Sequence, residues 1–304
     1  EVVRDYPNFL ISPYSVQTVL AFVQSGCKGE TASEIRDSLN LPDDDAKIES
    51  FAKDLQSVLK ENDEYTLRMA KKLFVKKGFQ INEGFKTAAT EVYKADVENV
   101  VFVPNTKAVD TMIDWAERQT NKKIKNFVSL GISDETARAV VINALYFKGN
   151  WSSQFVTYFT RKDDFYKADG NVVKVDTMHH YEEMFDYYED SERNAKFLKL
   201  PIEGEDVSMV IVLPKQKGGL RSLENRIVKV TKHRYFRKTY VNVALPKFKI
   251  ESTLNLSETL RNVKISDTLL RSRPKNFIAN HPFIFYIRVK NVIIFIGRVS
   301  EPSH

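Results

Sequence analysis

The chain has 304 residues and a formal net charge of +6, and its hydrophobic content of 42% and charged content of 28% are ordinary for a globular protein. Its length is ample for a substantial core. The only cysteine, Cys27, excludes an intrachain disulfide, and its expected role is that of a small buried hydrophobic residue. No stretch is long and apolar enough to predict a membrane-spanning helix, so no membrane partner is expected.

Basic residues gather in three places, which raises the question of a polyanionic partner such as a heparin-like glycan. No group is an unbroken run with stacking aromatic residues between the charges, and a nucleic-acid partner is not predicted. We favour solvated faces, with a glycan site at the second or third group as the alternative. The groups are Lys71, Lys72, Lys76 and Lys77; Lys122, Lys123 and Lys125; and Lys232, Arg234, Arg237 and Lys238.

Helical and strand patterns alternate in the first half of the chain. Ser12 followed by Pro13 is typical of a helix start, because a hydroxyl residue and a proline both suit the first turn. Apolar spacing predicts helices over residues 16–25, 30–39, 46–60, 85–92 and 109–123, and strands over residues 65–75, 95–102 and 139–147. The last of these is almost unbroken in its apolar residues, which predicts a strand buried on both faces.

The second half of the chain is predicted to be mostly β. Two strands within residues 165–178 flank the turn 168–171, and a hairpin joins residues 197–200 to 207–213. Further strands are expected at 241–245 and 248–250, and a last hairpin joins 283–289 to 292–299. No linker or repeat divides the chain. We therefore expect one α+β domain over residues 1–304, with helices packed on large, mostly antiparallel sheets.

The sequence gives little support for catalysis or metal binding. It has no phosphate-binding glycine loop, nucleophile elbow or zinc-protease motif. His179 and His180 are the best metal candidates, together with Asp176, Glu182 and Glu183. Adjacent strand residues point to opposite faces, so the two histidines are poorly placed to share an ion. We expect no enzyme activity, no metal and no cofactor.

Several segments, taken in order along nearly the whole chain, resemble the serpin family. The early ones are residues 8–15 (NFLISPYS), 29–32 (GETA) and 141–151 (VINALYFKGNW). The later ones are 165–166 with 175–178 (FY and VDTM), 209–214 (MVIVLP), 245–248 (LPKF), 281–285 (HPFIF) and 295–299 (FIGRV). One such phrase would mean little, whereas the ordered set is specific.

The resemblance implies a protease inhibitor that works by a conformational change. In serpins an exposed loop offers a bait bond, the protease is acylated, and the loop then inserts into the main sheet as a new strand. Residues that match the polar shutter beneath that sheet are Ser12, Pro13, Ser15 and Asn143, and Trp151 matches the breach where insertion begins. The alternative is a helix cap with a buried strand asparagine, and a large core aromatic.

The resemblance also places a candidate bait bond at Arg271-Ser272, just before a strand expected near Phe277. A trypsin-like serine protease, with a carboxylate in its specificity pocket, would accept Arg271. Arg273 is excluded because Pro274 blocks cleavage after it. The alternative is an ordinary basic linker.

The chain departs from the family pattern near residues 267–270. The hinge, one main-sheet strand and most of the reactive-centre loop are missing there, and the N-terminus also looks truncated. We therefore expect a serpin scaffold that does not trap its protease. The alternative is a non-inhibitory binding protein with a glycan or protein partner. The resemblance implies an extracellular protein, but residues 1–5 lack the apolar core of a signal peptide, so a cytoplasmic location stays open.

Overall fold

The computed structural model describes residues 7–59, 63–102, 105–120, 138–204, 206–232, 235–250 and 275–302. The chain divides into two compact units. We call Tyr14–Gly149 the helical unit, and Glu1–Pro13 with Asn150–His304 the β unit. Within the described ranges no helix is long and apolar enough to cross a membrane. The expected single domain stays a prediction.

The helical unit follows the predicted order of elements, with ends displaced by a few residues. Its helices are α1 (Pro13–Gly26), α2 (Gly29–Leu39), α3 (Asp45–Val58), α4 (Glu83–Glu91) and α5 (Asn105–Gln119). Side-chain caps begin two of them, because Asp44 accepts a hydrogen bond from the Ala46 amide and Asn82 accepts one from the Phe85 amide. Asn40 ends α2 in the left-handed conformation, with φ of 49°.

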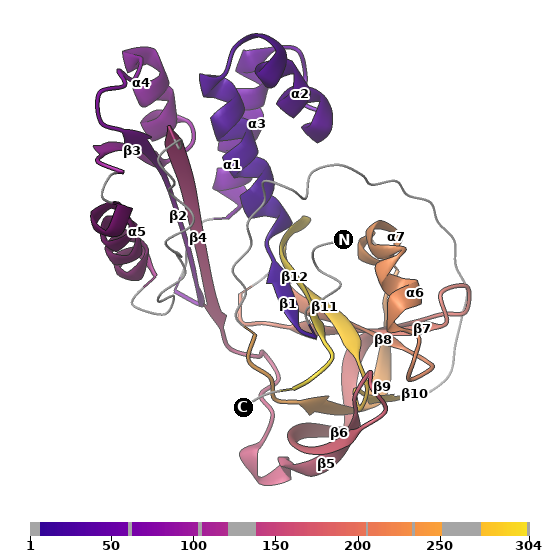
Figure 1. Cartoon of the computed structure of the whole chain (residues 1–304). Helices are drawn as coiled ribbons and strands as arrows, with labels where there is room; N and C mark the ends of the chain where they lie inside the picture. The colour runs from indigo at the N-terminus through magenta and orange to yellow at the C-terminus, as the bar shows by residue number, and fades with distance from the viewer. Residues whose placement is uncertain are drawn as a thin grey trace. The chain divides into compact units, whose positions relative to one another are not determined.

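Three strands form the sheet of the helical unit, in the order β3 (Ala95–Val100), β2 (Tyr65–Lys76) and β4 (Ala139–Gly149) (Figure 1). β2 pairs in parallel with β3 and antiparallel with β4. One face packs on α5 through a cluster that includes Phe74, Met112 and Ile142. The other face packs on α1, α3 and α4 through a cluster that includes Phe22 and Ile48.

The strand predicted to be buried on both faces, β4, is only partly buried, so that prediction is wrong. Ile142 and Ala144 are its only buried residues. β4 lies at the edge of the sheet, and among the described residues β2 is its only pairing partner (Figure 1). An edge strand has no lateral neighbour to shield its side chains, and an apolar sequence does not reveal this.

The β unit contains a nine-stranded sheet among the described residues. Its main path runs β1 (Phe9–Ile11), β12 (Val292–Val299), β11 (Phe283–Val289), β8 (Val207–Pro214), β7 (Ala195–Pro201), β6 (Val172–Asp190), β9 (Arg237–Pro246) and β10 (Lys275–Ile278). β5 (Arg161–Tyr166) pairs with β6, and a 3-10 turn, η2 (Thr157–Phe159), precedes β5. The three predicted hairpins are confirmed.

Two short helices, α6 (Leu220–Glu224) and α7 (Ile227–Thr231), cover part of this sheet. Their residues Leu223 and Val230 share a buried cluster with Phe197 and Val212 of the sheet. The strand predicted at 248–250 is absent from this described segment. Phe248 instead places its ring 5.2 Å from that of Phe285, so these residues contribute packing and not a hydrogen-bonded ladder.

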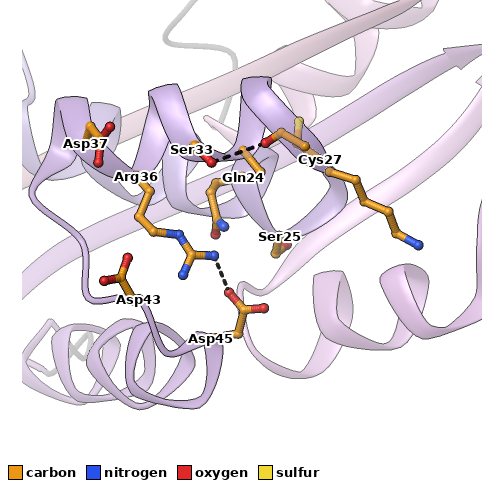
Figure 2. A pocket seen from close by; sticks show the side chains of 11 residues that line it. Gln24, Ser25, Cys27, Ser33, Arg36, Asp37, Asp43 and Asp45 are labelled. Atoms are coloured by element: carbon orange, nitrogen blue, oxygen red, sulfur yellow. Dashed lines mark hydrogen bonds and ion pairs between the residues drawn. The ribbon is translucent and has the colours of Figure 1, made fainter.

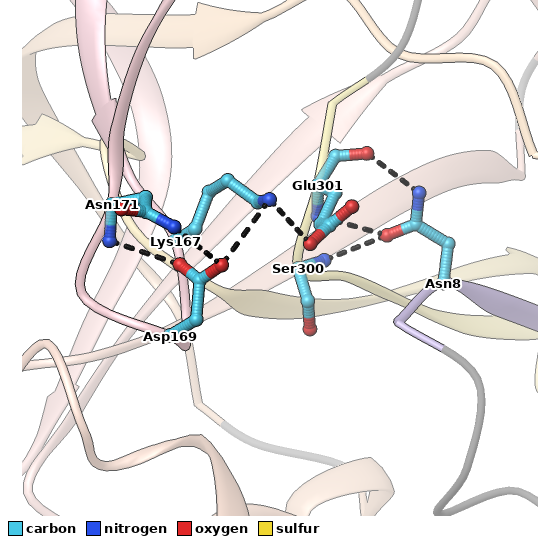
Figure 3. A network of polar contacts seen from close by, with 6 residues as sticks. All are labelled: Asn8, Lys167, Asp169, Asn171, Ser300 and Glu301. Atoms are coloured by element: carbon cyan, nitrogen blue, oxygen red, sulfur yellow. Dashed lines mark hydrogen bonds and ion pairs between the residues drawn. The ribbon is translucent and has the colours of Figure 1, made fainter.

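A polar clamp ties the two ends of the β unit together (Figure 3). The Asn8 side chain accepts hydrogen bonds from the amides of Ser300 (2.8 Å) and Glu301 (3.0 Å) and donates one to the Glu301 carbonyl (2.6 Å). Lys167 Nζ lies 2.7 Å from Glu301 Oε1 and 3.4 Å from Asp169 Oδ2, so the turn between β5 and β6 joins the same network.

Candidate functional site

The structure brings together two of the predicted shutter residues. Asn143 lies in β4 and Ser15 in the first turn of α1, and Asn143 Nδ2 donates a hydrogen bond to Ser15 Oγ. Ser15 is buried, as is Ser12, which directly precedes α1. Pro13 is the first residue of α1. The role of this cluster as a shutter stays a prediction.

The other half of the Asn143 amide is not satisfied within the described residues. Its Oδ1 is buried and has no hydrogen-bond partner there. The residue directly opposite Asn143 on β2 is Lys71, whose Nζ donates to the Tyr93 carbonyl at 3.0 Å. A buried acceptor without a donor is unfavourable, so a hydrogen-bond donor placed next to Asn143 Oδ1 would stabilise this position.

Lys71 itself was not expected in this place. The solvated face predicted for its group is wrong at this residue, because Lys71 is only 4% exposed. Burial lowers the pKa of Lys71 from its ordinary value of 10.5 to about 8. Its neighbour Lys72 is also largely covered, and it forms an ion pair with Glu98 at 2.8 Å.

Trp151, the predicted breach residue, is the second residue of the Asn150–His304 segment of the β unit. It forms an isolated bridge with Ile202 and stacks edge-on against Phe155 at 6.1 Å. Phe155 in turn lies 4.3 Å from the ring of His180. These contacts fit both a core aromatic and a breach residue, so the functional role stays a prediction.

The candidate bait bond, Arg271-Ser272, lies outside the described residues. The described chain resumes at Lys275, the first residue of β10, whose Nζ lies 2.7 Å from Glu189 Oε1. Lys215 reaches the same carboxylate at 3.1 Å, and the Tyr187 hydroxyl donates to it at 2.6 Å. Although burial raises the pKa of Glu189, the hydrogen bonds from Lys275, Tyr187 and Lys215 hold it at about 2. The strand β10, which follows the candidate bait bond in sequence, is therefore anchored by a charged cluster.

Further contacts hold β10 against the sheet. β10 runs parallel to β9, with Lys275 opposite Val241 and Asn276 opposite Asn242. The Asn242 amide donates to Asn276 Oδ1 at 3.2 Å, and Lys196 Nζ donates to the Asn276 carbonyl at 2.8 Å. Sequence reasoning missed this anchor, because its residues come from separate strands and follow no motif.

Only part of the predicted polyanion-binding group can be placed. Lys122, Lys123, Lys125 and Arg234 lie outside the described residues. Lys232, Arg237 and Lys238 are exposed, and Lys238 Nζ lies 3.3 Å from Asp186 Oδ1. One of the three exposed cations is thus already paired with a carboxylate.

The two candidate metal ligands in β6 point away from each other, as expected for neighbours in a strand. His179 Nε2 lies 2.9 Å from Asp163 Oδ2, whereas His180 Nε2 lies 3.3 Å from the Ser153 carbonyl. Within the described ranges no three His, Cys, Asp or Glu residues are arranged to hold a metal ion.

A cavity of about 500 Å³ lies between the end of α1, α2 and the start of α3 (Figure 2). Its lining includes Gln24, Cys27, Asp37 and Asp45, and Arg36 bridges it by an ion pair of 2.8 Å with Asp45. Burial raises the pKa of the Cys27 thiol, which disfavours the nucleophilic thiolate. The cavity contains none of the predicted site residues.

Comparison with known proteins identifies the family. Residues 2–273 match a family model described as Serpin (serine protease inhibitor). Antitrypsin of Bombyx mori is 34% identical over 275 residues, covering 88% of this chain and 69% of that protein. Antichymotrypsin-2 of Bombyx mori is 30% identical over 354 residues, covering 98% of this chain and 93% of that protein.

A solved structure shows the same fold. The crystal structure of Serpin48, described as a highly specific serpin in the insect Tenebrio molitor, superimposes with a TM-score of 0.91 and 40% sequence identity. The match covers 99% of this chain and 94% of that one. The α+β architecture is thus the serpin fold, and the chain belongs to the serpin family.

Proposed function

We propose that this chain offers Arg271-Ser272 to a trypsin-like serine protease and is cleaved as a substrate, without trapping the protease. The observation that carries the proposal is the spacing between Asp267 and Lys275, where β10 begins. Fully extended, these residues span at most about 28 Å. That length can expose one bond, but it leaves no residues for a new strand.

Two observations support the proposal that this chain lacks a segment of the serpin fold. The alignment with Antichymotrypsin-2 runs over 354 positions, whereas this chain has 304 residues, so at least about 50 positions of the alignment have no residue here. Among the described residues, the outer edge of β4 has no pairing strand and Asn143 Oδ1 has no donor. A further main-sheet strand would supply both.

The trypsin-like target rests on the bait residue. The related Antitrypsin and Antichymotrypsin-2 bear the names of two different protease targets on one family fold, which suggests that the fold does not select the protease. Arg271 fits a specificity pocket that holds a carboxylate. An extracellular location is part of this proposal and rests on the family resemblance.

The test is to mix the purified chain with equimolar trypsin and to follow it on a denaturing gel and by intact mass. We expect cleavage after Arg271 and no covalent complex, and the Arg271→Ala variant should lose that cleavage. A stable band at the summed mass of the two proteins would overturn the non-trapping proposal. Cleavage at other bonds alone would overturn the bait assignment.

A second candidate is a non-inhibitory role in binding a heparin-like glycan. The exposure of Lys232, Arg237 and Lys238 favours it, although Lys238 is partly neutralised by Asp186. Such binding should weaken steeply with salt. Retention on a heparin column that drops when Lys232 and Arg237 are both changed to Ala would support this role, and unchanged retention would exclude these residues from it.

A further inference from the structure

The sheet next to the bait bond carries an exposed apolar pair. Met184 of β6 lies directly opposite Tyr240 of β9, and the two side chains are 45% and 60% exposed. The next residue along each strand, Phe185 in β6 and Val241 in β9, is buried in the core. Met184 and Tyr240 thus belong to the solvent face of a well-packed sheet.

The exposed face continues from this pair to β10. Tyr240 and Asn242 are two residues apart in β9 and so project to the same side. Asn242 is paired with Asn276 of β10, and both residues are exposed. We call Met184, Tyr240, Asn242 and Asn276 the β6–β10 face.

The β6–β10 face lies within reach of any protease bound at the candidate bait bond. Lys275 is opposite Val241, the residue next to Tyr240. Three residues lie between Arg271 and Lys275, so four Cα–Cα steps keep Arg271 within at most about 14 Å of the start of β10. A domain of about 200 residues has a radius of gyration of about 16 Å, which is longer than this tether. A protease bound at this bond must therefore extend over the surface around the start of β10.

We infer that the β6–β10 face is a second contact surface for the trypsin-like protease that cleaves Arg271-Ser272. The inference rests on the proposed function, because it needs that bond to be the one cleaved. Tyrosine and methionine are enriched at protein–protein interfaces, and the two asparagines add hydrogen-bonding groups beside them. The two apolar side chains carry no charge, which makes a protein partner a better match than a polyanionic glycan.

The test measures kcat/KM for trypsin cleavage after Arg271, followed by intact mass on the full chain. The double variant Met184→Ala with Tyr240→Ala should lower kcat/KM by roughly fivefold or more, which is the effect of losing an interface contact worth about 1 kcal/mol. The effect should fall on KM. Tyr240→Phe keeps the ring and should keep most of the rate.

A matched control removes an exposed aromatic ring elsewhere. Phe51 of α3 is 52% exposed, and Phe51→Ala should leave kcat/KM unchanged. An equal loss in both variants, or no loss in the double variant, would overturn the inference while leaving the bait bond intact. Absence of cleavage after Arg271 in the unmodified chain would overturn the proposed function and this inference together. Unchanged melting temperatures establish that all variants are folded.

Discussion

Asn143 Nδ2 donates a hydrogen bond to Ser15 Oγ, and this bond connects the edge strand β4 to the first turn of α1. The bond satisfies only one end of the asparagine amide, since Oδ1 is buried without a donor in the described part of the chain. The pair is therefore half of a polar network. Truncating Ser15 and truncating Asn143 should cost different amounts of stability, because each change leaves different polar groups without a partner.

Ser15→Ala should destabilise the protein more than Asn143→Ala. The first change leaves both ends of the buried amide unpaired, at a cost of about 1–3 kcal/mol. The second removes the unpaired Oδ1 together with the donor, so part of its cost is offset. Urea unfolding of both variants at neutral pH measures the difference. Equal losses, or a larger loss for Asn143→Ala, would mean that Oδ1 has a donor.

Lys71→Met should stabilise the protein at pH 7. The pKa of Lys71 is lowered from 10.5 to about 8 by burial, so the folded state loses its proton more readily than the unfolded state. Below pH 8 the charged lysine therefore opposes folding, by about 3 kcal/mol from the size of the shift. Between about pH 8 and 10.5 only the unfolded state stays protonated, so this cost fades as pH rises.

The measurement is urea unfolding of the wild type and Lys71→Met at pH 7 and at pH 9.5. The lost hydrogen bond to the Tyr93 carbonyl offsets about 1 kcal/mol, so a net gain of about 2 kcal/mol is expected at pH 7. The gain should shrink at pH 9.5. A variant that is less stable at pH 7, with no dependence on pH, would contradict the prediction.

The sequence predicted most helices and strands because their signals are local. Ser12-Pro13 begins α1 as expected, and the alternating pattern of residues 65–75 corresponds to β2. Asn143 and Ser15 are in contact, and their role as part of a shutter stays a prediction. Lys71 was misjudged because a lysine in a strand looks solvent-facing, and only the packing of α1, α3 and α4 over that face buries it.

Other features depend on pairing between distant segments, which no local pattern reports. β4 is only partly buried and pairs with β2 alone among the described residues, although its apolar sequence is typical of a central strand. The cluster at Glu189 draws Lys275 and Lys215 from strands far apart in sequence. The Met184–Tyr240 pair likewise exists only through the register of β6 with β9.

Glu189→Gln should destabilise the β unit at pH 7, and this destabilisation should be much smaller at acid pH. The Glu189 pKa is held at about 2, below its ordinary value of 4.5, so the carboxylate contributes to stability above about pH 4.5. Because solvent screens this partly exposed carboxylate, that contribution is on the order of 1 kcal/mol, and it is lost as pH falls towards 2. Urea unfolding of both proteins at pH 7 and pH 3 measures the difference, which should be smaller at pH 3. A constant difference would mean that the cluster acts by packing and not by charge.

Asn8→Ala should loosen the end of the β unit without unfolding the sheet. The variant loses two bonds accepted from the Ser300 and Glu301 amides and one donated to the Glu301 carbonyl. These hydrogen bonds are partly buried, so water can replace only part of what Asn8 supplies, and we expect a loss of about 1–2 kcal/mol. Hydrogen exchange should rise at the amides of Ser300 and Glu301, while amides within β11 and β12 stay protected.

Asn8→Asp is the matched control for this clamp. Its carboxylate still accepts from both amides but has no hydrogen to donate to the Glu301 carbonyl. It also lies near the Glu301 carboxylate, which Lys167 already pairs at 2.7 Å. Exchange at Ser300 and Glu301 should therefore fall between the rates of the wild type and Asn8→Ala. If these amides exchange as fast in Asn8→Asp as in Asn8→Ala, the bond donated to the Glu301 carbonyl supplies most of the stabilisation and the two accepted bonds contribute little.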